Sequence, residues 1–74
     1  MTIYRKRNRD FGDERTYTIE TYDGSQGNPS TFIVGDGTPV EIYTTDFILT
    51  ETGDATKKWV CRNSVFAPTF EEVV

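Results

Sequence analysis

The sequence predicts an all-β protein, on two features of composition and one of pattern. Ile, Val and Thr together number twenty-three of the 74 residues, whereas the apolar helix formers are one Leu, one Met and two Ala. Branched side chains lose rotamer freedom in a helix and pack well on a pleated strand. Turn-forming stretches recur about every ten residues. We therefore expect a small antiparallel barrel or sandwich of five or six strands, SH3-like or OB-like in size.

The first expected strand runs from Thr2 to Arg9 and the second from Arg15 to Tyr22. In the second, apolar and polar residues alternate, so one face is apolar enough to meet a core. That face carries Tyr17, Ile19 and Thr21, and the opposite face carries Thr16, Thr18, Glu20 and Tyr22.

Two segments in the middle of the chain are expected to form strands separated by tight turns. Residues 23–30 are almost all turn formers, and a short strand at residues 31–34 follows them. Glycines permit positive φ at residues 35–39, which favours a tight hairpin. Residues 40–50 are the longest apolar-rich segment, and their alternation breaks at Thr45-Asp46. A bulge or bend at this point would let one strand serve two sides of a barrel.

The last part of the chain holds one more clear strand. A turn at residues 51–56 leads into a strand at residues 57–62, with Trp59 and Cys61 on one face. The tail at residues 63–74 is expected either to add a short closing strand or to stay partly loose.

Length and composition indicate a single domain over residues 1–74. A chain this short is expected to fill one core and not two, with a net stability of about a few kcal/mol. Its composition, 35% hydrophobic and 14% aromatic, favours a folded core over disorder. One Cys permits no intrachain disulfide, and neither a signal-like stretch nor a membrane-length apolar run is found. We therefore expect a cytoplasmic protein.

Charge is distributed unevenly along this chain of net charge −4. Residues 1–15 carry a net +2, residues 16–56 carry seven acids and no base, and residues 57–74 carry a net +1. The sequence thus describes an acidic body with basic ends, which bears on solubility and partner choice. If the termini are adjacent, the two basic ends meet.

The basic residues concentrate in the stretch RKRNRDFGDER, residues 5–15, which holds five of the eight. Beyond Tyr4 neither face of this stretch is apolar, and burying an unpaired cation costs about several kcal/mol. We therefore expect it to project as a hairpin, with a turn at residues 10–13 that places Phe11 near the tip.

Two interpretations of this basic hairpin remain open. In the first it is a solvated edge whose arginines pair locally with Asp10, Asp13 and Glu14. In the second it is a contact arm whose arginines bind carboxylates or phosphates, while Phe11 anchors in a partner's pocket.

Catalysis is not expected. The chain has no His, and Cys61 has no identifiable partner base, so we expect no catalytic residues and no cofactor. The ligand count excludes a structural zinc site. Calcium stays open, but Asp23, Asp36 and Asp54 lack EF-hand spacing and are typical turn formers, so we expect no metal site.

The leading hypothesis is a non-catalytic interaction module that binds another protein, as an accessory or inhibitor protein of the kind that viruses and mobile elements encode. Tyr22 and Tyr43 lie on faces opposite Ile19 and Ile42 and are expected to be exposed, as on a protein-contact surface. The expected partner-binding residues are Arg5, Lys6, Arg7, Arg9, Phe11, Tyr22 and Tyr43.

Three alternatives remain beside it. The basic hairpin, with Lys57, Lys58 and Arg62, could bind nucleic acid. The acidic body could mimic nucleic-acid charge and occupy a basic groove. The chain could also be a structural subunit that self-associates along a strand edge. No membrane partner is expected, and the sequence leaves the oligomeric state open.

Overall fold

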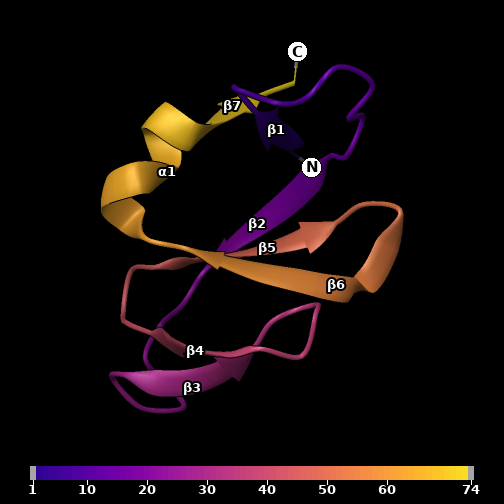
Figure 1. Ribbon diagram of the computed structural model, residues 1–74. Helices are drawn as coiled ribbons and strands as arrows, with labels where there is room; N and C mark the ends of the chain where they lie inside the picture. Colours follow the sequence, from indigo (N-terminus) through magenta and orange to yellow (C-terminus); the bar gives the residue numbers. More distant parts are fainter. Residues whose placement is uncertain (1, 74) are drawn as a thin grey trace.

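The computed structural model describes residues 2–73. In these residues seven strands form two antiparallel sheets, and one short helix packs beside them (Figure 1). The elements are, in chain order, β1 (Tyr4–Lys6), β2 (Tyr17–Thr21), β3 (Ser30–Ile33), β4 (Pro39–Ile42), β5 (Phe47–Glu51), β6 (Asp54–Cys61), α1 (Asn63–Thr69) and β7 (Phe70–Glu72).

The larger sheet has the strand order β6-β5-β2-β1-β7, and β3 pairs only with β4. The larger sheet curves, so that β1, β7 and α1 arch over one face of β2, β5 and β6 (Figure 1). The β3–β4 hairpin lies against the opposite face. The three central strands are therefore covered on both sides.

The expected β class is confirmed. Of the barrel or sandwich of five or six strands that the sequence predicts, no closed barrel is found, and residues 2–73 form seven strands. Residues 43–46 turn the chain sharply between β4 and β5, and Thr45 adopts a left-handed φ of 79°. The predicted bend at Thr45-Asp46 therefore exists, but it separates two strands that belong to different sheets. The result is an open five-stranded sheet with a hairpin packed on it, because the ladder between β3 and β4 does not continue into the larger sheet.

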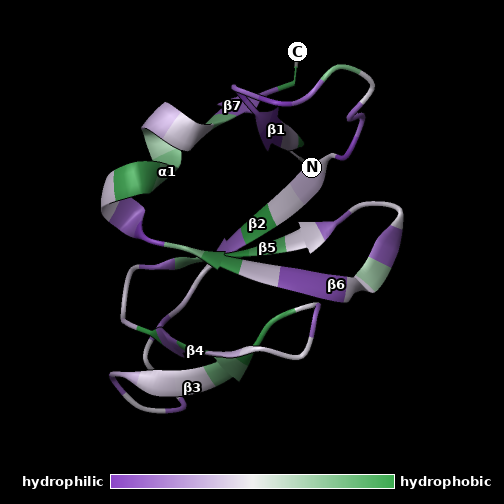
Figure 2. Ribbon diagram, in the orientation of Figure 1, coloured by the Kyte–Doolittle hydropathy of each residue, from purple (hydrophilic) through white to green (hydrophobic). Residues whose placement is uncertain are grey.

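Two hydrophobic clusters take the place of the single expected core. Adjacent residues of β5 point to opposite faces, as the two-residue period of a strand requires, so that Leu49 packs in the first cluster and Ile48 in the second. Figure 2 shows apolar positions along these central strands. The first cluster contains Tyr17, Leu49, Cys61 and Phe70, with Ile19, Trp59 and Phe66 packed against it. The second contains Tyr22, Ile42 and Ile48, with Phe32 and Val60 packed against it.

The tail of the chain forms a helix that the sequence did not indicate and then a closing strand. Residues 63–69 carry no side-chain cap at the helix start and include Pro68, so the usual helix signals are weak. Phe66 fixes the helix through ring contacts with Tyr4, Phe47 and Phe70. The strand β7 then pairs with β1, so the two basic ends of the chain do meet.

Candidate protein interface

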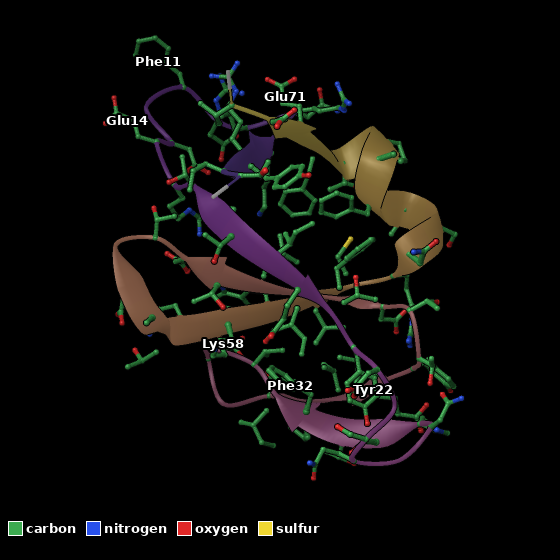
Figure 3. The ribbon with its side chains drawn as sticks, turned by 180° about the vertical axis from the view of Figure 1, so that it is seen from behind. Phe11, Glu14, Tyr22, Phe32, Lys58 and Glu71 are labelled. Carbon is green, nitrogen blue, oxygen red and sulfur yellow. The ribbon has the colours of Figure 1, made fainter. Side chains whose placement is uncertain are left out.

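The ten residues 7–16 between β1 and β2, here called the tip loop, project from the body of the protein. Phe11 is 108% exposed, which is full exposure, and Figure 3 shows it pointing away from the sheets. The turn beneath it closes through the Asp13 amide, which donates to the Asp10 carbonyl at 3.0 Å, and Gly12 takes a φ of +87° there. Figure 2 shows this loop as hydrophilic except at its tip. The hairpin expected at residues 5–15 is thus shorter in the structure, because Arg5 and Lys6 belong to β1 and pair with β7.

Hydrogen bonds fix the base of the tip loop. The Arg7 amide donates to the Thr69 carbonyl at 2.9 Å, and its Nε donates to the Ala67 carbonyl at 2.8 Å. On the other side of the loop, the Arg15 guanidinium donates to Asp13 at 2.9 Å and lowers the pKa of that carboxyl to about 2. Phe11 is therefore carried on a loop with a defined shape.

Three arginines converge on one carboxylate beside the tip loop. Arg5 Nε donates to Glu71 Oε2 at 2.7 Å, Arg7 Nη1 lies 3.5 Å from Oε1, and Arg9 Nη1 lies 3.9 Å from Oε2. The hydrogen bond from Arg5, followed by the charges of all three arginines, lowers the pKa of Glu71. Three positive charges against one negative charge leave this group, here called the arginine cluster (Arg5, Arg7, Arg9 and Glu71), with a net +2.

The expected local pairing of the arginines with the loop acids is wrong for Arg5, Arg7 and Arg9. Among the residues described, only Arg15 pairs with a loop acid. The physical reason is the register of β1 on β7, which places Arg5 directly opposite Glu71 on the outer face. Glu71 is thus a site residue that the sequence analysis missed, because no local pattern links residues 66 positions apart.

Lys6 does not belong to the arginine cluster. It lies opposite Phe70 in the β1–β7 ladder, and Phe70 is buried in the first hydrophobic cluster. Lys6 therefore points to the inner face of β1, away from its two arginine neighbours, because successive strand residues alternate between faces.

The two tyrosines named from the sequence lie elsewhere, and the expected exposure of Tyr22 is wrong. Tyr22 is 7% exposed, its hydroxyl donates to the Gly27 carbonyl, and it packs in the second cluster because the β3–β4 hairpin covers that face. Tyr43 is 39% exposed, but its ring lies under the Arg62 guanidinium at 4.5 Å. In Figure 3, Phe11 and Tyr22 stand at opposite ends of the molecule. The structure does not join the tyrosines to the tip loop.

The other basic residues are also dispersed. Lys58 donates to Thr50 Oγ1 at 2.9 Å on the β5–β6 ladder, and Arg62 is bound to Asp46. Lys57 lies beside Gly35. None of these three side chains forms an ion pair with the carboxylate of the arginine cluster.

No family model, curated protein or solved structure matches this chain. Across residues 2–73, no helix combines the length and the apolar character that crossing a bilayer requires.

Proposed function

We propose that this protein is a non-catalytic, cytoplasmic interaction module that binds an acidic surface of another protein through the tip loop and the arginine cluster. The observation that carries the proposal is the full exposure of Phe11 on a loop whose base is fixed by hydrogen bonds. A large apolar side chain held in water contributes little to folding, whereas aromatic anchors contribute much of the affinity of protein interfaces. An accessory or inhibitor protein would need no more than such a surface.

The charge beside Phe11 indicates the chemistry of the partner. The arginine cluster keeps a net +2, and its guanidinium groups are held in place by Glu71, Ala67 and Lys6. Fixed arginines lose little side-chain entropy on binding and match the planar fork of a carboxylate. We therefore expect an acidic patch on the partner, next to an apolar pocket that receives Phe11.

Site-specific photo-crosslinking tests the proposal. The photoreactive p-benzoylphenylalanine replaces Phe11 in one sample and Ile33 in the control, and each protein is irradiated in a lysate of the organism that encodes it. Ile33 is also an exposed apolar residue, at 58%, but it lies on the β3–β4 hairpin away from the tip loop. We expect a discrete crosslinked protein from position 11 and none from position 33. The same products from both positions would contradict the proposal.

Binding of the captured partner then tests the role of charge. We expect Phe11→Ser to weaken binding about 30-fold or more, as loss of an aromatic anchor worth about 2 kcal/mol or more would. Arg5→Gln with Arg9→Gln should weaken it further at low salt and make it less sensitive to salt. Lys57→Gln with Lys58→Gln, the charge-matched control on β6, should change binding little.

The same variants also test whether the protein binds nucleic acid. Three phosphate contacts by the arginine cluster would give a log-log salt slope of about −3 on duplex DNA. Such a slope, abolished by the arginine substitutions and indifferent to Phe11→Ser, would replace the protein-binding proposal with nucleic-acid binding.

A further inference from the structure

The inner face of β1, opposite the arginine cluster, borders an apolar pocket of about 440 Å³. The pocket is bounded by β1, β2, β5, β6, α1 and β7, and its volume falls within the range of about 300–1,000 Å³ that is usual for small-molecule sites. Its lining residues include Lys6, Arg15, Tyr17, Trp59, Arg62 and Val65.

The floor and walls of this pocket are hydrophobic. The buried side chains of the first cluster all line it, namely Tyr17, Leu49, Cys61 and Phe70. Val65 on α1 and Trp59 on β6 stand on its walls, and Val65 is 47% exposed although it is apolar. An apolar ligand would remove this surface from water, which is the main source of favourable binding free energy in such sites.

The charged side chains that line the pocket are all basic, although Glu51 accepts a hydrogen bond at 2.8 Å from Nε1 of the lining residue Trp59. Lys6 comes from β1, Arg15 from the end of the tip loop and Arg62 from the end of β6, and none of the lining residues within 2–73 is acidic. Asp13 holds Arg15, and Asp46 holds Arg62, whereas Lys6 forms no ion pair or side-chain hydrogen bond with any residue that the structure describes. Lys6 is therefore the cation of the lining that is left to meet an anionic ligand.

A second pocket gives the contrast. It measures about 380 Å³ on the side of the second cluster, and its lining includes Glu20 and Asp23 but no base. The charged lining residues of the two pockets therefore differ in sign, which favours an anion in the first over the second.

We propose that the first pocket binds a small amphipathic carboxylate, of the class of a medium-chain fatty acid, with its chain against Tyr17, Leu49 and Trp59 and its carboxylate at Lys6. This inference is independent of the protein partner proposed for the tip loop, because Phe11 does not line the pocket.

The sole tryptophan of the chain reports directly on this pocket, because Trp59 stands in its wall. We propose titrating the protein with decanoate, below the concentration at which it forms micelles, and with decan-1-ol of the same chain length. Decanoate should change the Trp59 fluorescence saturably with one site per chain. It should also bind more tightly than decan-1-ol, although the alcohol is the more apolar molecule and would bind better to a pocket without a cation.

Four variants separate the pocket from non-specific binding. Lys6→Gln should weaken decanoate about three- to fivefold, as expected for one partly exposed ion pair, and leave decan-1-ol unchanged. Val65→Asp places a carboxylate on the wall and should abolish binding of decanoate. Lys57→Gln and Ile33→Asp, which make the same changes outside the pocket, should bind as the native chain does. Circular dichroism checks that each variant is folded.

Each other outcome overturns the proposal. These outcomes are a fluorescence change that does not saturate, equal affinity for decanoate and decan-1-ol, or an unchanged affinity in Lys6→Gln. The last two do not depend on whether Val65→Asp folds. Phe11→Ser should bind decanoate normally, so a failure of the tip-loop proposal would leave this result standing.

Discussion

Asp46 is the one charged residue in 2–73 that the structure places in the interior, and its contacts explain why. The Tyr43 amide donates to Asp46 Oδ2 at 3.0 Å, Arg62 Nη1 donates to the same oxygen, and the Asn63 amide reaches Oδ1. Burial alone would raise the pKa of Asp46, but these hydrogen bonds outweigh it and hold the pKa below its usual value. One side chain thus ties the β4–β5 turn to the start of α1.

We expect Asp46→Asn to lower the free energy of unfolding at pH 7 by about 2 kcal/mol, because hydrogen bonds to a charged acceptor are lost or weakened. In the native chain, the contribution of ionised Asp46 to the free energy of unfolding is present in full above its unfolded pKa of about 3.9. It disappears as the pH falls through the lower pKa of Asp46 in the folded protein. The difference between variant and native chain should therefore shrink below about pH 4. Urea unfolding followed by Trp59 fluorescence at pH 7 and pH 3 measures it, and an equal difference at both pH values would contradict this account.

At the scale of elements, the sequence located most of the strands, but it made the first one too long, joined β4 and β5 into one, and missed the helix. The turns around Gly37 and Gly53 depend on neighbours in the chain, and both are found. Of the face predicted for β2, Tyr17 and Ile19 reach the first cluster, whereas Thr21 is exposed. The helix α1 depends instead on Phe66 meeting aromatic rings from β1, β5 and β7, which are contacts between distant residues. Tyr22 was misjudged for a similar reason, since strand alternation separates two faces but does not say that both are covered.

Phe66 should therefore stabilise α1 far more than the exposed Val65 beside it does. We expect Phe66→Ala to cost about 2–3 kcal/mol, at or below the range for fully buried phenylalanine because this ring is half-buried. Val65→Ala, on the same helix, should change the stability by less than about 0.5 kcal/mol. Thermal and urea unfolding of the two variants provide the comparison. Equal losses would mean that the helix is not fixed through the aromatic rings.

At the scale of the whole molecule, length predicted one core, whereas the chain builds two on one sheet. The strands β2, β5 and β6 contribute side chains to both clusters or adjoin both, so neither cluster can be lost without disturbing the other. The candidate interface, too, could be predicted from the sequence only in part. The exposure of Phe11 could be predicted from a charged stretch without an apolar face, but the convergence of arginines on Glu71 depends on the β1–β7 pairing.

This arrangement predicts a single cooperative unfolding transition. Ile42→Val in the second cluster and Ile19→Val beside the first should each lower the stability by about 0.5–1 kcal/mol. Trp59 packs against the first cluster, so a shift of its fluorescence transition by Ile42→Val would show that the clusters are coupled. If Ile42→Val shifts only the circular dichroism transition and not that of Trp59, the two halves unfold separately.

The pairing of β1 with β7 has a practical consequence for anyone who handles this protein. The Val73 amide donates to the Ile3 carbonyl at 2.8 Å, so both ends of the described chain emerge side by side, next to Arg5 and Glu71. An affinity tag fused at either end would crowd the surface that any capture experiment is meant to present. A short linker between the ends, with the backbone opened at the exposed Gly53 turn, would yield a circular permutant whose tag sits away from that surface.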